Sequence, residues 1–225
     1  MKVAILMAGP YRGNNDIIQN QLNMIGSYDT YVSCFEHYKE DWIKSEWPIK
    51  EIFTTISINF KETNWYSQRN NSAGQSGFWQ FWNLKNVINN IEEDYDFYIK
   101  SRSDLNFETG DITPYMFTTL EKNTLYSSAH RFHGGSWDRE HLLNDQFYIG
   151  DMNTMNVISK FVTKYYNKHR HGLNDAGPFV GSNESSLREY LKENGINVLP
   201  LYNIIFHKDH NGYSGVSNGS QLEKI

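Results

Sequence analysis

The sequence has only one cysteine, Cys34, among its 225 residues. A single cysteine excludes an intramolecular disulfide and a zinc site built on cysteine ligands. It also suits a reducing compartment, where structural disulfides are rare.

Long apolar runs are missing as well. The apolar run at the N-terminus, "KVAILMAG", breaks at Gly9-Pro10, and no cleavage-type region follows it, so we do not interpret it as a signal peptide. No run approaches the ~20 apolar residues that span a bilayer. We therefore expect a soluble, cytoplasmic protein without a transmembrane segment.

An excess of positive charge is also lacking. Lys and Arg number 21 against 26 Asp and Glu, which gives a net charge of -5. This balance argues against a nonspecific nucleic-acid binder, which usually carries a basic stripe. Aromatic residues are abundant at 15%, so they must supply much of the core and contribute to binding surfaces.

Strands and helices alternate along the first part of the chain. The apolar run 2–9 predicts a strand that is buried on both faces, and residues 16–25 carry apolar side chains at helical spacing. Further strands are predicted at 28–35 and 49–58. This alternation favours one α/β domain with a mostly parallel central sheet flanked by helices.

The rest of the chain continues in the same manner. A polar stretch rich in Gly, Ser and Asn, residues 64–77, predicts a loop before the next helix. The apolar periodicity predicts helices over 78–91, 155–165 and 183–194, and strands over 95–101, 123–130, 145–151 and 196–206. We expect one domain over residues 1–206 and a mobile tail over 207–225.

The segment "YDFYIKSRSDLNF", residues 95–107, begins as a predicted buried strand and carries three charges near its end. The pleat of a strand predicts that Tyr95, Phe97 and Ile99 face one way and that Tyr98, Lys100 and Arg102 face the other. Asp104 falls just past the strand's carboxyl end, where open α/β sheets bind ligands. A carboxylate at this place is a candidate ligand for Mg²⁺ or Mn²⁺, and Lys100 and Arg102 could pair with phosphates of the same ligand. An ordinary salt bridge at a strand end is the alternative.

The loop Gly9-Pro10-Tyr11-Arg12-Gly13 follows the first predicted strand. Gly9 and Arg12 are candidates for approaching a nucleotide, and Tyr11 is a candidate for stacking on a base. The loop lacks the spacing of a dinucleotide fingerprint or a Walker A loop. A simple Gly-Pro turn with a solvated Arg12 is the alternative, and Arg69 and Gln75 are weaker candidates for donor contact.

The segment "HGGSWDREHLLNDQF", residues 133–147, gathers polar and aromatic side chains. Trp137 and Asn144 are candidates for sugar contact. If the reaction inverts the anomeric centre, a carboxylate must deprotonate the acceptor, and Asp145 is the first candidate and Asp138 the second. Asp145 as a capping residue is the alternative. The two histidines of the segment lack further ligands at sensible spacing, so a zinc site is not expected.

Several of these segments together resemble GT-A-fold glycosyltransferases. "YDFYIKSRSDLNF" resembles the strand that carries their Asp-x-Asp motif, most of all in the small enzymes of large DNA viruses and bacterial capsule clusters. "KVAILMAGPYRG" resembles their first strand and nucleotide-facing loop, "NDQFYIGDMNTM" their acceptor-side segment, and "SNESSLREYLKENGINV" the helix and strand near their C-terminus. One departure is that Arg102 replaces the first Asp of Asp-x-Asp. Either Asp104 carries the metal alone, or Arg102 takes over part of the metal's charge-neutralising role.

The resemblance implies a single GT-A-like domain that transfers a sugar from a UDP- or GDP-linked donor to a glycan or other hydroxyl acceptor, assisted by Mn²⁺ or Mg²⁺. It implies polysaccharide biosynthesis in a bacterium or a virus-infected cell. It also suggests acceptor or sugar contact by Glu184 and metal ligation by His207, although a helix-dipole residue and a solvated tail are the alternatives. A non-catalytic carbohydrate-binding module and a sugar nucleotidyltransferase remain the competing functions.

Overall fold

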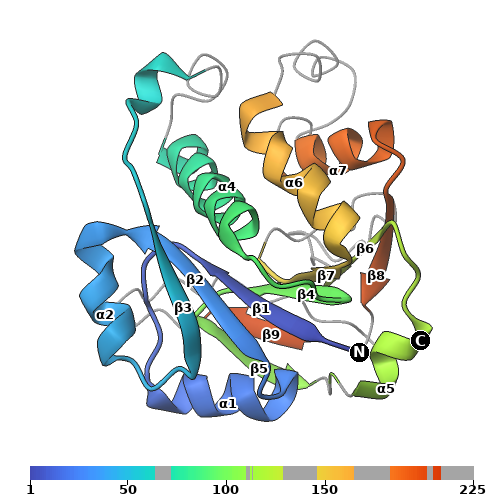
Figure 1. The fold of residues 1–225 in the computed structure, drawn as a ribbon, viewed down its shortest axis with the longest axis horizontal. Coiled ribbons are helices and arrows are strands. Elements are labelled where there is room, and N and C mark those ends of the chain that lie inside the picture. The colour runs from blue at the N-terminus through green and yellow to red at the C-terminus, as the bar shows by residue number, and fades with distance from the viewer. Residues whose placement is uncertain are drawn as a thin grey trace, which may run out of the picture.

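A seven-stranded sheet organises the part of the chain that the structure describes (Figure 1). This computed structural model describes residues 1–63, 72–109, 112, 114–128, 146–164, 183–201 and 205–208. The strand order is β3-β2-β1-β4-β7-β6-β8. The strands are β1 (Val3–Ala8), β2 (Asp29–Phe35), β3 (Ile49–Thr55), β4 (Phe97–Ser101), β6 (Thr124–Ser128), β7 (Tyr148–Gly150) and β8 (Asn197–Leu201).

The sheet is mostly parallel, as the sequence predicts. β1 pairs in parallel with β2 and β4, β2 with β3, and β6 with β8. Only β7 runs against its neighbours β4 and β6. The predicted α/β domain is confirmed.

Helices cover both faces of this sheet (Figure 1). One face carries α4 (Ser72–Asn90), α6 (Met152–Lys164) and α7 (Asn183–Glu193). The other face carries α1 (Asn15–Ile25), α5 (Pro114–Thr119) and a small ribbon of β5 (Leu105–Thr109) and β9 (Ile205–Lys208). A short 3-10 turn, η1 (Glu36–Tyr38), leads into α2 (Lys39–Lys44) beside the sheet, and a second, η2 (Phe60–Glu62), follows β3.

Two apolar clusters, one on each face, explain the uninterrupted apolar run of β1. Ala4 and Leu6 pack under α4, whereas Val3, Ile5 and Met7 pack on the α1 side. Because both faces of this parallel strand are buried, apolar residues are favoured at every position and not only at alternate ones.

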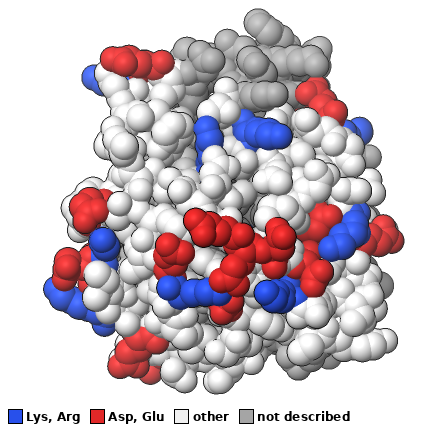
Figure 2. Space-filling model, in the orientation of Figure 1, with Lys and Arg blue, Asp and Glu red and all other residues white. Residues whose placement is uncertain are grey.

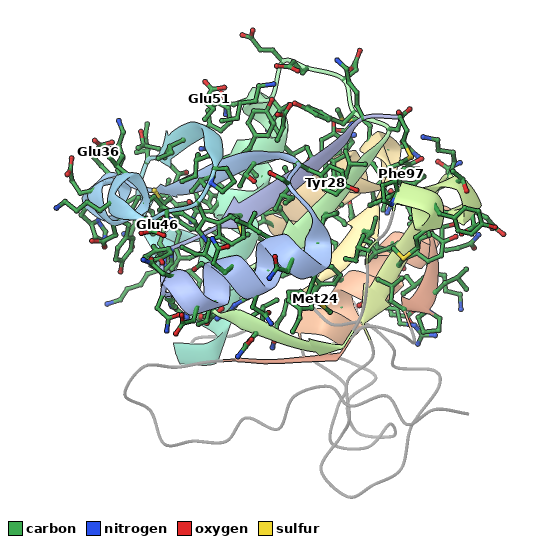
Figure 3. The ribbon with its side chains drawn as sticks, turned by 90° about the horizontal axis from the view of Figure 1, so that it is seen from below. Met24, Tyr28, Glu36, Glu46, Glu51 and Phe97 are labelled. Atoms are coloured by element: carbon green, nitrogen blue, oxygen red, sulfur yellow. The ribbon has the colours of Figure 1, made fainter. Side chains whose placement is uncertain are left out.

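The alternation predicted for β4 is confirmed for its apolar residues. Phe97 and Ile99 lie in the cluster on the α1 side, and Tyr98 lies in the cluster on the α4 side. Tyr95 was predicted to share the face of Phe97 but packs on the α4 side, because it precedes β4 and does not follow the pleat. Figure 3 views the α1 face, where Tyr28 and Phe97 both lie close to Phe117 of α5, with ring centroids 6.0 and 5.7 Å from it.

Polar side chains fix where the helices begin. Asn14 caps α1, since its side-chain oxygen accepts a hydrogen bond from Ile17 N at 2.9 Å. Asp151 caps α6 by accepting from Thr154 N at 2.9 Å. Burial alone would raise the pKa of Asp151, but the bonds from Thr154 and Asn123 outweigh it and lower that pKa.

Several elements differ from the sequence prediction. Residues 72–77 belong to α4 and are not part of a loop, because this polar stretch continues into a helix whose apolar face packs on the sheet. The short helices α2 and α5 were not predicted. The chain also turns sharply at 102–104 and divides the predicted segment into β4 and β5.

Charged groups at the amino-terminal ends of the strands form an ion-pair network. Lys50 Nζ lies 2.8 Å from Asp29 Oδ2 and also pairs with Glu93, and Tyr95 OH donates to Asp29 at 2.7 Å. Figure 2 shows acidic side chains gathered in a band across the side of the molecule that is turned toward the viewer, with basic side chains beside them. No helix among the described residues combines the length and hydropathy needed to cross a membrane.

Candidate functional site

A cavity of about 290 Å³ lies at the carboxyl ends of β1, β2 and β4. The strand order reverses at this place, because β2 and β3 follow β1 on one side while β4 lies on the other. Such switch points are where open α/β sheets bind ligands. The cavity is lined by Ala8, Gly9, Pro10, Arg12, Phe35, Tyr38, Trp42, Ser76, Trp79, Gln80, Asn83, Arg102, Ser103 and Asp104.

The structure brings four of the predicted site residues together in this cavity, namely Gly9, Arg12, Arg102 and Asp104. Arg102 and Asp104 also bind each other. Arg102 Nε donates to Asp104 Oδ1 at 2.8 Å and Nη2 donates to Oδ2 at 2.6 Å. The Asp104 side chain is 1% exposed and that of Arg102 is 16% exposed, so the pair is largely shielded from water. A two-bond fork of this kind fixes the guanidinium plane as well as its position.

Gln21 holds the turn that carries this pair. Its side chain is fully buried in α1, and its Nε2 donates to the carbonyls of Arg102 and Leu105, both at 2.8 Å. Its oxygen accepts from Ser101 Oγ at 3.1 Å. The amide therefore joins α1 to both sides of the turn between β4 and β5.

The loop after β1 packs tightly against the same turn. Arg12 N donates to Ser103 Oγ at 2.9 Å. A Cβ on Gly13 would stand only 2.4 Å from the Ser103 carbonyl oxygen, so the close approach requires glycine. Gly9 has a φ of 108° and its N–H donates to Ser33 O at 2.8 Å.

Trp42 of α2 fastens the loop from the other side, because its Nε1 donates to Gly9 O at 3.0 Å. The Tyr11 ring packs edge-on against Trp42, with centroids 5.3 Å apart, and joins the cluster on the α1 side. Burial raises the pKa of Tyr11. Tyr11 therefore packs against α2 and is not among the cavity-lining residues. Its role in base stacking stays a prediction.

Helix α4 forms the wall opposite the loop. Asn83 is 1% exposed; its side-chain oxygen accepts from Ser33 Oγ at 3.2 Å, and its nitrogen donates to Trp79 O at 2.9 Å. The Trp79 ring stands edge-on to Phe35 with centroids 5.0 Å apart. This wall was missed by the sequence analysis, and the signal that would have found it is polar Asn83 on the inward face of an apolar helix.

A second cavity of about 560 Å³ adjoins the first at the carboxyl ends of β2 and β3. Phe35 and Trp79 line both cavities. The second is otherwise lined by Glu36, His37, Thr54, Thr55, Ile56 and Ser57. The Phe35 and His37 rings are stacked at 5.8 Å. Aromatic faces beside hydroxyl and carboxylate groups are a surface that suits a ring with several hydroxyls.

The comparisons with known proteins support the architecture. No protein-family model and no curated protein matches the sequence. Among solved structures, the 4-diphosphocytidyl-2C-methyl-D-erythritol synthase from Anaerococcus prevotii is similar, with a TM-score of 0.51, 10% identity, and coverage of 90% of this chain and 89% of that chain. The chain has a GT-A-like fold.

Two other solved structures have lower scores. The apo form of mouse xyloside xylosyltransferase 1 has a TM-score of 0.47 at 10% identity and covers 88% of this chain and 84% of its own. A 2-C-methyl-D-erythritol 4-phosphate cytidylyltransferase from Francisella tularensis has a TM-score of 0.45 at 11% identity, with coverage of 89% and 90%.

Lys100 of this GT-A-like sheet lies apart from the cavity-lining residues. Its side chain is fully buried, Nζ donates to Gln146 O at 3.0 Å, and Nζ stands 5.6 Å from the centre of the Tyr148 ring. Gln146 lies two residues before the start of β7. Lys100 therefore holds the main chain just before β7 in place. Phosphate contact by Lys100 stays a prediction.

Several predicted residues fall outside the described residues: Arg69, Trp137, Asp138, Asn144 and Asp145. For Glu184 and His207 the backbone is described. Glu184 lies in the first turn of α7. His207 lies on β9 and pairs with Asn106 of β5, which follows Asp104 by two residues in the sequence.

The predicted metal site centres on Asp104. Within the described residues, no group of three or more His, Cys, Asp or Glu could hold a metal ion. Both oxygens of Asp104 already accept hydrogen bonds from Arg102. The carboxylate therefore does not fit a divalent ion while Arg102 keeps this position. Cys34 adds no ligand, because burial raises the pKa of its thiol to about 11.

Proposed function

We propose that this chain is a glycosyltransferase that moves a sugar from a nucleoside diphosphate donor to a hydroxyl group of a glycan. One observation carries the proposal: the switch-point cavity gathers Arg12 and Arg102 at the carboxyl ends of β1 and β4. A departing nucleoside diphosphate develops negative charge, and guanidinium groups that line the cavity stabilise it. Arg12 is exposed, whereas Arg102 is partly buried. The pair Arg102–Asp104 keeps one of these groups in a set orientation before the donor arrives.

The two adjoining cavities suit the two ends of such a donor. The diphosphate lies between Arg12 and Arg102 in the first cavity, and the nucleoside extends past Phe35 and Trp79 into the second. Glu36 and the hydroxyls of Thr54 and Thr55 would meet the ribose there.

Further residues serve the transferred sugar and the acceptor. Asp145, or Asp138 as the second candidate, acts as the base toward the acceptor, and Trp137, Asn144 and Glu184 contact sugar or acceptor. These assignments come from the sequence alone. Hexosyl or deoxyhexosyl transfer in polysaccharide biosynthesis, in a bacterium or a virus-infected cell, is the narrower form of the proposal.

Sugar nucleotidyl transfer is the second candidate, because the solved structure with a TM-score of 0.51 is named as the synthase of a diphosphocytidyl compound. The loop after β1 favours the glycosyltransferase. Gly9 N and Arg12 N already donate within the protein, and Pro10 has no N–H. Few backbone N–H groups of this loop therefore remain to bind a triphosphate.

The test is a thermal-shift panel of UDP, GDP, CDP and ADP and their sugars, followed by assays of sugar transfer and donor hydrolysis. A ligand that binds the native state raises the melting temperature by mass action. The variant Arg12→Gln should lose the shift, while Lys160→Gln, an exposed cation on α6, should keep it. Release of pyrophosphate from a nucleoside triphosphate and a sugar phosphate would instead identify the nucleotidyltransferase. Binding of free sugars without any nucleotide would identify a carbohydrate-binding module.

A further inference from the structure

The pair Arg102–Asp104 places a fixed cation where the predicted metal would lie. Asp104 is almost fully buried, and a buried carboxylate must be neutralised and hydrogen-bonded. Arg102 supplies both functions through two bonds of 2.8 and 2.6 Å. We propose that the donor diphosphate binds in this cavity without a divalent ion, with the guanidinium of Arg102 in the ion's place and Asp104 as the positioning residue that orients it.

This inference rests on the proposed function, since it concerns how the same cavity neutralises a diphosphate. A divalent ion bound to Asp104 would stand about 2 to 2.5 Å from a carboxylate oxygen. Those oxygens already lie within hydrogen-bond distance of Arg102. The ion and the guanidinium would then be close cations in a site of low water content, where their repulsion is strong.

The surrounding bonds fix the main chain of Arg102. Gln21 binds the Arg102 carbonyl and the hydroxyl of Ser101, and the hydroxyl of Ser103 accepts from Arg12 N. Moving the turn to admit an ion would break bonds to buried groups, which is costly.

Arginine chemistry suits this role. A guanidinium stays charged at all working pH values and matches phosphate oxygens with parallel N–H groups, whereas an ammonium is a point charge. Arg12, Arg102 and Asp104 together leave one net positive charge on the cavity wall. The wall therefore attracts an anion even though the whole chain has a net charge of -5.

Isothermal titration calorimetry with UDP and GDP tests the inference in excess EDTA and again in excess Mn²⁺. The dissociation constant of whichever nucleotide binds should differ less than about threefold between the two conditions. Binding that requires Mn²⁺ would overturn the inference and leave the proposed function standing. Absence of binding in both conditions would overturn the two together.

Two variants at position 102 distinguish a change in how the nucleotide is bound from a loss of folding. Arg102→Gln should weaken binding in EDTA by about tenfold or more, because it removes a charged hydrogen-bond donor. Arg102→Asp restores the first carboxylate of Asp-x-Asp, and its nucleotide binding should depend on Mn²⁺. Electron paramagnetic resonance of Mn²⁺ should show the ion bound by Arg102→Asp and not by the wild type. Metal-independent binding by Arg102→Asp would contradict the assignment, and the wild-type comparison decides the matter if this variant does not fold.

Discussion

Replacing Gln21 with methionine tests whether the turn that carries Arg102 is held from α1. Methionine has a similar length and volume and can occupy the same buried space, so little packing is lost. The change removes the three hydrogen bonds of the amide, two donated to the carbonyls of Arg102 and Leu105 and one accepted from Ser101 Oγ. Two buried carbonyls and one hydroxyl then lose their partner at Gln21.

The expected cost follows from these three groups. A buried polar group left without a partner costs about 1–3 kcal/mol, and partial relaxation of the turn brings the total to roughly 3–5 kcal/mol. This is a large part of the ~5–15 kcal/mol by which a domain is stable. For a chain of this size the melting temperature should fall by about 6–20 °C.

Urea unfolding followed by tryptophan fluorescence measures the loss of free energy. Gln19→Met is the matched control, because Gln19 is exposed on the same helix and should change stability by less than ~0.5 kcal/mol. UDP or GDP binding by Gln21→Met should weaken in parallel as the turn at Arg102 loosens. A loss below about 1 kcal/mol for Gln21→Met would refute the claim that this amide holds the turn.

The sequence predicts the central strands because burial on both faces leaves a plain signal. The apolar runs of β1 and β2 and the alternation of Phe97, Tyr98 and Ile99 follow from the pleat of a covered parallel sheet. Helices α2 and α5 each have only 6 residues. Such a length covers too few turns to reveal a helical period, and tertiary packing decides these segments.

The candidate site is predictable only where it follows strand ends. Gly9, Arg12, Arg102 and Asp104 come directly after β1 or β4, and parallel strands bring their carboxyl ends to one edge. Gln21 and the α4 wall could not be predicted, because a polar residue on a helix is expected to face solvent. The inward position of Gln21 depends on which backbone groups of a distant turn need partners.

The charges at the end of β4 show the same limit. Lys100 and Arg102 occupy alternate positions of one strand face, so the sequence assigns both to one ligand. In the structure the Lys100 ammonium binds Gln146 O, whereas the Arg102 guanidinium binds Asp104. Periodicity gives the face of a side chain but not its partner, which comes from whatever segment packs there.

Three further predictions concern the loop after β1 and the amino-terminal network. Gly13→Ala should destabilise by about 1–3 kcal/mol in urea unfolding and weaken UDP or GDP binding, because its Cβ would meet the Ser103 carbonyl; unchanged binding would contradict this. Trp42→Phe should cost about 1 kcal/mol in the same assay, since it removes one hydrogen bond to the loop. Lys50 lowers the pKa of Asp29 by hydrogen bonding, so the stability that Asp29 contributes is present above its ordinary pKa of 3.8 and is lost as the pH falls through the lowered value. The difference in melting temperature between wild type and Lys50→Met should therefore shrink in acid below about pH 4. A difference that stays constant from neutral pH into acid would show that Lys50 stabilises the strand ends by packing and not by charge.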